Sequence, residues 1–531
     1  MSSWLSAQSI NAQPTLDQLA SIPAGPTEDP ETHPVAERAT CRVYDRSTRS
    51  RAINHPDRPA AGAAAAPRGP LLPVIGGDLR APLVFGEPVR YVNLDYAASA
   101  PALAVVAARV TEVLPVYSSV HRGAGYASQV STQLYESARA TVGRFVGARD
   151  DDVVVFTRNT TDALNLLASC LPAQRADGAA GDVVVLDLEH HANLLPWQRL
   201  AHRCLPAAST IEATLDALRV ALRAAPATLV AITGASNVTG ETLPLAQVAA
   251  IAHRYGARLV VDAAQLAPHR RIDLDALGAD YVAFSGHKLY APFGAGVLIG
   301  RRDWLDAAPA YLAGGGAVRS VSTEQVAWAD APARHEGGTP NVLGAVALAT
   351  ACDTIAALPE GALATHETAL LTRLTDGLAT VGGIRQLRVW AEPTDHIGVL
   401  GFTVDGHHAG RVAAYLSAEY GIGVRDGRFC AHPLLATLTG GQPALRASVG
   451  LGSCSADIDR LIVALEQLRR RGARWHYAGV GDRYVPDPDP RPDHPNAFPD
   501  WAAGISTAAG QVATLPCEVT DASLAAPPTN W

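Results

Sequence analysis

The chain has 531 residues, a formal net charge of −8 and 48% hydrophobic residues, a content that suits about two to four folded domains. The mildly acidic, dispersed charge and the lack of an apolar run of about 18 residues argue against a nucleic-acid-binding surface and a membrane span. Seven cysteines without CxxC spacing, and an N-terminus without a basic-then-apolar pattern, predict a cytoplasmic protein without disulfides, a metal site or a secretory signal.

Both ends of the chain differ in composition from its middle. Residues 1–85 are rich in Pro, Ala, Ser and Thr without a lasting helical or strand period, which predicts a disordered N-terminal extension. Residues 477–531 contain a Pro/Asp-rich run, VPDPDPRPDHPNAFPD, and predict a C-terminal extension of the same kind. Between them we expect a large domain over 86–365 and a small α+β domain over 366–476, with residues 86–105 contributing to the small domain.

Short apolar, β-branched runs alternate with helical patterns through the large domain. The chain predicts strands at 152–157, 182–188, 228–233, 258–262, 280–285 and 296–300, with helical stretches at 161–170, 196–203 and 245–255 between them. This alternation is typical of an α/β domain with a mostly parallel sheet flanked by helices. The small domain follows, with strands at 388–390 and 397–404 and helices at 408–420 and 456–471. In such folds, functional residues gather after the carboxyl ends of strands.

Polar residues follow the first two predicted strands. Thr160 and Thr161 open a helix, where hydroxyls and free N–H groups form a phosphate seat; an ordinary N-cap is the alternative. His190 and His191 follow the second strand, and adjacent histidines point to different sides of an extended chain. One of them could therefore stack on a flat cofactor, although a pair of loop histidines is an equal alternative.

Lys288 follows the fifth strand and is the only lysine among 43 basic side chains. Arginine can replace lysine as a surface cation, but not where chemistry needs an amine that loses its proton. Asp262 ends the fourth strand 26 residues earlier, one strand–helix–strand unit away, so both side chains can reach one cleft. A Schiff-base amine, a carboxylate for a ring nitrogen, a histidine and a phosphate seat are the set that pyridoxal phosphate (PLP) chemistry requires.

Many segments of the chain match one family in order. They include YVNLDYAASA, VHRGAGYAS, FTRNTTDALNL, LEHHANLLPWQ, VDAAQ, FSGHKLYAPFGAGVL, HEGGTPN and YGIGVRDGRFCAHPL. Residues from about 91 to 470 thus resemble the class V aminotransferase-fold enzymes, most closely the group II cysteine desulfurases and selenocysteine lyases. The resemblance implies a homodimeric PLP enzyme of fold type I. Its large domain would hold a mostly parallel seven-stranded sheet flanked by helices, beside a smaller α+β C-terminal domain.

The resemblance also implies a role for individual residues. Lys288 would form the Schiff base, Asp262 would pair with the pyridine nitrogen, Gln265 would bond the ring oxygen and His190 would stack on the ring. Thr160, Thr161, Ser285 and His287 would seat the phosphate, and Thr339 would reach it from the other subunit. The substrate would be bound by Asn237, Arg446, Arg425 and His121.

The reaction that the resemblance implies depends on Cys430. It lies in an R-x-G-x-x-C-A-x-P segment in which the family carries its nucleophile, and Arg425 in the same segment would favour the thiolate. The resemblance implies conversion of L-cysteine or selenocysteine to L-alanine, with a persulfide on Cys430 and a sulfur-acceptor protein as partner. For an isolated cysteine, a buried apolar role is the alternative.

The chain departs from the family after Arg446-Ala-Ser, where Val-Gly-Leu-Gly-Ser-Cys replaces a Tyr-Asn-Thr type segment. This departure leaves the amino-acid substrate open. Another PLP enzyme of this fold, namely a C–S lyase, epimerase or transaminase in specialised metabolism, is the first alternative. A catalytically silent assembly partner is the second, and the presence of Lys288 argues against it. The terminal extensions could dock a sulfur acceptor, cover the site or have no role.

Overall fold

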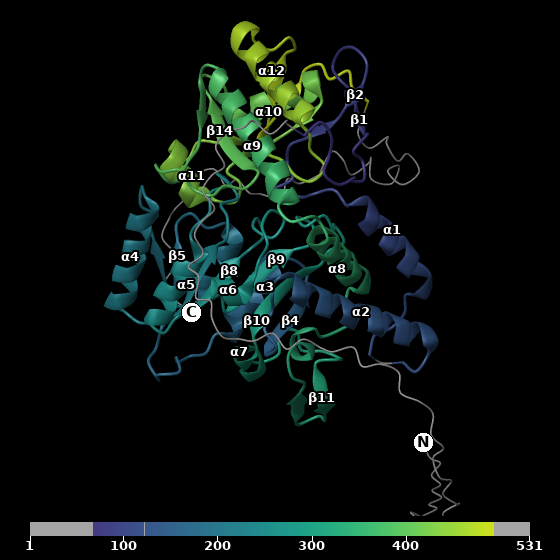
Figure 1. Cartoon of the computed structure of the whole chain (residues 1–531), viewed down its shortest axis with the longest axis vertical. Helices are drawn as coiled ribbons and strands as arrows, with labels where there is room; N and C mark the ends of the chain where they lie inside the picture. Colours follow the sequence, from purple (N-terminus) through teal and green to yellow (C-terminus); the bar gives the residue numbers. More distant parts are fainter. Residues whose placement is uncertain (1–66, 122, 493–531) are drawn as a thin grey trace, which may run out of the picture. The chain divides into compact units, whose positions relative to one another are not determined.

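The computed structural model describes residues 67–121 and 123–492 (Figure 1). A seven-stranded sheet in the order β4-β10-β9-β8-β7-β5-β6 forms the centre of the large domain. Strands β5 to β9 pair in parallel, whereas β10 runs antiparallel to both β9 and β4, so the predicted mostly parallel sheet is confirmed. The strands are β4 (Asp152–Thr157), β5 (Asp182–Leu186), β6 (His202–Leu205), β7 (Ala227–Thr233), β8 (Arg258–Asp262), β9 (Tyr281–Ser285) and β10 (Gly296–Arg301).

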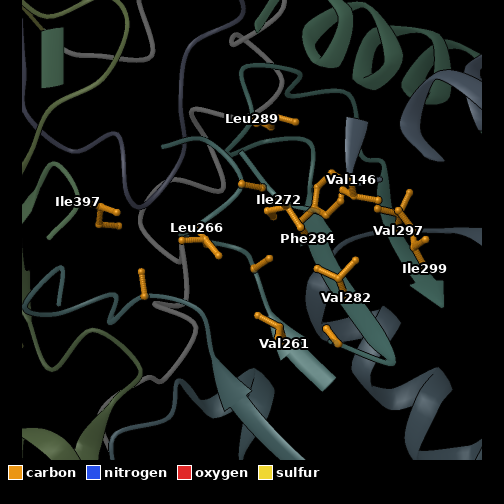
Figure 2. Close-up of a cluster of buried hydrophobic side chains, with 14 of the residues drawn as sticks. Val146, Val261, Leu266, Ile272, Val282, Phe284, Leu289, Val297, Ile299 and Ile397 are labelled. Carbon is orange, nitrogen blue, oxygen red and sulfur yellow. The ribbon is translucent and has the colours of Figure 1, made fainter. Parts of the chain in front are cut away.

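The central strands are apolar on both faces because each face packs against its own layer of side chains. On β5, Val184 belongs to one hydrophobic cluster and its neighbours Val183 and Val185 to another, as successive strand residues point to opposite faces. Figure 2 shows part of the first cluster, in which Val282 on β9 lies beside its registered partner Ile299 on β10. Burial on both faces explains the near-continuous apolar runs in the sequence.

Helices cover the sheet where their apolar stripes face it. In α4, the buried Leu215, Leu218 and Leu222 recur at helical spacing, while the exposed face includes the charged Glu212, Asp216 and Arg223. The large domain contains α1 (Ala104–Val113), α2 (Tyr126–Phe145), α3 (Thr160–Cys170), α4 (Ile211–Ala224), α5 (Leu245–Arg254), α6 (Leu274–Leu277), α7 (Arg302–Ala307) and α8 (Val342–Ala356). Four short 3-10 helices join them: η1 (Leu114–Val116), η2 (His191–Asn193), η3 (Trp197–Arg199) and η4 (Ala333–His335).

A second core defines the small domain, coloured green to yellow in Figure 1. It centres on residues such as Leu374, Phe402, Leu416 and Leu465, and on an antiparallel sheet in the order β13-β14-β17-β16. The strands are β13 (Ile384–Gln386), β14 (Val399–Val404), β16 (Arg425–Gly427) and β17 (Ala444–Ser448). The helices are α9 (Ala362–Thr380), α10 (Ala409–Tyr420), α11 (His432–Thr439) and α12 (Ser455–Arg471).

An N-terminal segment joins this second core. Strand β3 (Val92–Asn93) pairs in parallel with β15 (Ile422–Gly423), and Val92 and Leu94 are buried in the small-domain cluster. Three further antiparallel pairs lie outside the two main sheets. They are β1 (Arg80–Ala81) with β2 (Val89–Arg90), β11 (Val318–Val321) with β12 (Val326–Trp328), and β18 (Tyr477–Val480) with β19 (Arg483–Pro486).

The predicted extensions need correction where the structure describes them. Residues 67–85 were expected to be disordered, but the Leu71 N–H donates to the Leu451 carbonyl at 2.8 Å and the strand β1 forms there. In the same way, residues 477–492 form the β18–β19 hairpin, and Trp475 Nε1 donates to the Pro488 carbonyl at 2.8 Å. Distant partners supply these contacts, which local composition does not reveal. The remainders of both predicted extensions, 1–66 and 493–531, lie outside the described residues.

Two predicted elements differ from the observed ones. The helical stretch expected over 196–203 is the single turn η3 followed by the edge strand β6, because residues 202–205 pair with β5. The strand expected at 388–390 lies earlier, at β13. Among residues 67–121 and 123–492, no helix is long and apolar enough to cross a membrane, and no cluster of His, Cys, Asp and Glu could hold a metal ion.

Candidate active site

The carboxyl ends of the parallel strands and the small domain together line a cavity of about 340 Å³. All predicted site residues except Thr339 and His121 line it, although up to 286 residues separate them in the sequence. The large domain supplies the cavity-lining Thr160, Thr161, His190, Asn237, Asp262, Gln265, Ser285, His287 and Lys288, and the small domain supplies Arg425, Cys430 and Arg446.

One end of the cavity is formed by the N-terminus of α3. The Asn159 side chain caps this helix by accepting from the Asp162 N–H at 3.0 Å, and the Thr160 N–H donates to Ser285 Oγ at 2.7 Å. The Thr160 and Ser285 hydroxyls lie 2.6 Å apart. A helix N-terminus carries the positive end of the helix dipole, so the cluster of hydroxyls and N–H groups there suits a phosphate. The alternative of an ordinary N-cap is confirmed, with Asn159 as the capping residue, and the phosphate seat stays a prediction.

Asp262 and His190 line the wall of the cavity, and burial shifts their pKa values in opposite directions. Asp262 is 3% exposed; burial raises its pKa, while the Ala264 N–H and Lys288 favour its charged form. Burial, with a contribution from Lys288, lowers the pKa of His190 to about 3, so its ring is neutral at neutral pH. The His190 Nδ1 accepts from the Ala192 N–H at 3.0 Å, which fixes the orientation of the ring. A neutral imidazole held in this way can stack on a flat ring.

Lys288 lies at the end of β9 among charged groups. Burial lowers its pKa to about 8; Asp262 and Cys430 oppose this shift, and Arg446 adds to it. A lysine with this pKa carries a substantial neutral fraction near neutral pH, which a nucleophilic or basic amine needs. Neighbouring His287 is neutral as well, because burial and Lys288 lower its pKa to about 4.

Arg446 on β17 is the buried cation of the small-domain wall. Its Nη2 donates to Asp95 Oδ1 and its Nη1 to the Asn237 carbonyl, both at 2.9 Å. Its Nε is buried and, within the residues that the structure describes, makes no hydrogen bond. The guanidinium lines the cavity, so the arrangement suits the carboxylate of an amino-acid substrate. The role of Asp95 as the partner of Arg446 was missed, although Asp95 lies in the YVNLDYAASA segment used for the resemblance.

Cys430 reaches the cavity from the turn between β16 and α11. The Cys430 carbonyl accepts from the His191 N–H at 2.8 Å, so the turn is tied to the loop that carries His190. Phe429, also missed from the sequence, lines the cavity beside it. The thiol of Cys430 and the amine of Lys288 are close enough to influence each other electrostatically. The structure therefore brings a thiol and an amine into one cavity.

Two predicted site residues lie elsewhere. His121 is exposed and its Nε2 lies 3.0 Å from Glu136 Oε1, away from the cavity, so within one chain it does not line the substrate site. Thr339 is exposed too and does not line the cavity, and its implied role in a second subunit stays a prediction. The resemblance had assigned Thr339 to the other subunit's site, whereas for His121 the motif position gave no subunit.

Comparisons with known proteins agree with this geometry. Residues 92–461 match the "Aminotransferase class-V" family. A cysteine desulfurase of Dickeya dadantii is 40% identical over 73% of this chain and 93% of its own length, and one of Enterobacter sp. is 38% identical over 72% and 94%.

Solved structures agree as well. A cysteine desulfurase of Thermococcus onnurineus is 32% identical with a TM-score of 0.65, covering 72% of this chain and 95% of that chain. A cysteine desulfurase of Escherichia coli is 34% identical with a TM-score of 0.62, covering 71% and 94%. These matches confirm the expected PLP-enzyme fold type I. The chain belongs to the class V aminotransferase family.

Proposed function

We propose that this chain is a PLP-dependent cysteine desulfurase that transfers sulfur from L-cysteine to Cys430. The observation that carries the proposal is one cavity lined by Lys288, Asp262, His190 and Cys430. Two relatives, 40% and 38% identical to this chain over 396 and 393 residues, are named cysteine desulfurase, and the family is one of PLP-dependent enzymes.

The residues present fit PLP. The N-terminus of α3 with Thr160 and Ser285 suits the phosphate, buried Asp262 suits a protonated ring nitrogen, and neutral His190 suits a ring face. Lys288 supplies the amine that would hold the aldehyde carbon. When bound, the cofactor would withdraw electrons from the α-carbon of the amino acid.

The remaining steps belong to side chains of this chain. The Arg446 guanidinium would donate to the substrate carboxylate, and Lys288 would take the α-proton and hold it for return to the carbon skeleton. The Cys430 thiolate would attack the substrate sulfur: an S–S bond forms, the Cβ–S bond breaks, and its electron pair stays on carbon, which is protonated. L-cysteine and one thiol thus give L-alanine and the Cys430 persulfide. An acceptor thiol would then remove the terminal sulfur and regenerate Cys430.

The test is incubation of the purified, PLP-loaded protein with L-cysteine and a dithiol reductant. We expect equal amounts of L-alanine and sulfide, with the rate lowered at least about 100-fold in both Lys288→Ala and Cys430→Ala. Cys204→Ala is the matched control, because Cys204 is an exposed cysteine on β6 outside the cavity. Release of pyruvate, or full activity in Cys430→Ala, would instead indicate a C–S lyase or another reaction of this fold.

A further inference from the structure

The turn that carries Cys430 has an uncommon backbone conformation. Phe429 and Cys430 have φ angles of +55° and +53°, two consecutive non-glycine residues in the left-handed region. A side chain in this region is disfavoured by contact between Cβ and the backbone, so such residues persist only where their surroundings hold them. Other interactions must therefore stabilise the turn that presents the thiol.

The Asn237 side chain makes a hydrogen bond to this turn. Its Nδ2 donates to the Phe429 carbonyl at 2.8 Å, and Asn237 itself is 5% exposed. Asn237 lies in the tight turn after β7, where the Ser236 hydroxyl accepts from the Val238 and Thr239 N–H groups, both at 3.2 Å. The donor is thus held by a rigid element of the large domain, while the acceptor belongs to the small domain.

Arg446 completes the link between the turn and the substrate site. Its Nη1 donates to the Asn237 carbonyl, and its guanidinium carbon lies 5.3 Å from the centroid of the Phe429 ring. The Asn237 backbone therefore helps to hold Arg446, while the Asn237 side chain holds the Phe429 carbonyl. Asn237 therefore acts on Cys430 indirectly, through the backbone of the Phe429–Cys430 turn.

We infer that Asn237 is a positioning residue for the nucleophile, holding the strained Phe429–Cys430 turn so that the thiol faces the cavity. This role differs from the carboxylate binding that the sequence resemblance implied for Asn237. The inference rests on the proposed sulfur transfer to Cys430. Loss of the Asn237 amide would leave amino-acid binding largely intact and would impair the attack of Cys430 on sulfur.

Two reactions of the PLP-loaded protein separate these roles. Release of alanine from saturating L-cysteine needs Cys430, whereas exchange of the L-alanine α-proton with D2O needs Lys288 and carboxylate binding but no thiol. For Asn237→Ala we expect alanine release to fall about tenfold or more and α-proton exchange to stay within about threefold of the wild type, because small misplacement of a nucleophile is costly. Equal losses in both reactions, or no loss in either, would overturn the inference.

Two further variants guard against a folding artefact. Asn237→Ser keeps a polar residue in the turn but cannot span the distance to Phe429, and it should show the same split. Asn165→Ala is the matched control: the Asn165 amide also donates to a backbone carbonyl, that of Thr161 at 2.9 Å, without touching the Cys430 turn. It should leave the ratio of the two reactions unchanged, and a shift of that ratio would contradict the inference.

Alkylation of Cys430 distinguishes failure of the inference from failure of the proposed function. With iodoacetamide and mass spectrometry, Cys430 in Asn237→Ala should react faster than in the wild type, while the exposed Cys204 reacts at the same rate in both. A wild type that releases no alanine from cysteine contradicts the proposed function alone. A Cys430 alkylation rate that is unchanged or lower in the variant contradicts the inference alone.

Discussion

At the scale of single residues, burial sets the chemistry of the cavity. Burial keeps His190 and His287 neutral, raises the pKa of Asp262 against the opposing effects of the Ala264 N–H and Lys288, and lowers the pKa of Lys288. A chain that keeps one lysine thus places it where an amine can lose its proton near physiological pH. An arginine at this position would stay charged at every accessible pH.

The pKa of Lys288 leads to a prediction for the protein without cofactor. Since only the neutral amine reacts with an aldehyde, the association rate of PLP should rise about tenfold per pH unit below pH 8 and level off above about pH 8. Stopped-flow absorbance between pH 6 and pH 10 measures this. In Asp262→Asn the midpoint should move to lower pH, because a negative charge that favours the ammonium form is lost. A wild-type rate that still climbs at pH 10 would show an unshifted lysine.

At the scale of elements, the phosphate seat depends on close packing between β10 and the start of α3. Gly296 on β10 pairs with Thr157, and a Cβ on Gly296 would lie 2.5 Å from Asn159 Cα and 2.9 Å from its nitrogen. Backbone cannot yield as a flexible side chain does. Residue 296 must therefore be a glycine because a side chain would not fit there. Its backbone conformation does not require glycine, since any residue can adopt its φ.

Gly296→Ala should displace the N-terminus of α3. We expect the free energy of unfolding to fall by about 1–3 kcal/mol in urea denaturation, and the affinity for PLP to fall with it. Gly479→Ala is the control, because Gly479 also lies in a strand, β18, with nothing within 4 Å of its added Cβ. Equal stability of the two variants would show that β10 does not constrain the seat.

At the scale of the whole molecule, the active site depends on how two separately cored domains meet. An ionic cluster joins them: Glu367 on α9 contacts His269 and Arg270, which follow the Asp262 loop of the large domain. Burial opposes the charge on Glu367, but His269 and Arg270 outweigh it and lower its pKa. Arg270 also bonds Asp395 and the His396 carbonyl, so the cluster extends into the small domain.

Glu367→Gln tests this link through the pH dependence of stability. Because the folded-state pKa of Glu367 lies below its unfolded value of 4.5, its contribution is present above pH 4.5 and is lost as pH falls through the folded pKa. The wild type should therefore exceed the variant in free energy of unfolding at pH 7, by about 3 kcal/mol, and the gap should narrow below pH 4.5. Urea denaturation across pH 3.5 to 7 measures the gap. A gap that stays constant over that range would exclude ionised Glu367 as its cause.

Many residues of the site could be predicted because they follow the carboxyl ends of strands. The strands themselves can be recognised in the sequence as apolar runs. Asp262 and Lys288 were placed in one cleft by the length of one strand–helix–strand unit, and the cavity holds both. The edge strand β6 and the ordered residues 67–85 could not be predicted, because their stabilising partners lie far away in the sequence. His121 was predicted at the site but lies outside the cavity, because a matching motif does not reveal which way a side chain faces.

The sequence by itself determined the α/β class, the order of the main strands, and the lysine, carboxylate and histidine that the chemistry needs, because these depend on local periodicity and residue type. The role of Cys430 came from the resemblance of its motif to the family. Tertiary structure alone decided that Asp95 partners Arg446, that burial lowers the pKa of Lys288 to about 8, and that Asn237 holds the Phe429 carbonyl. The physical reason is that desolvation and hydrogen-bond partners arise only when the two domains pack together. These effects set the protonation and the orientation of the side chains in the cavity.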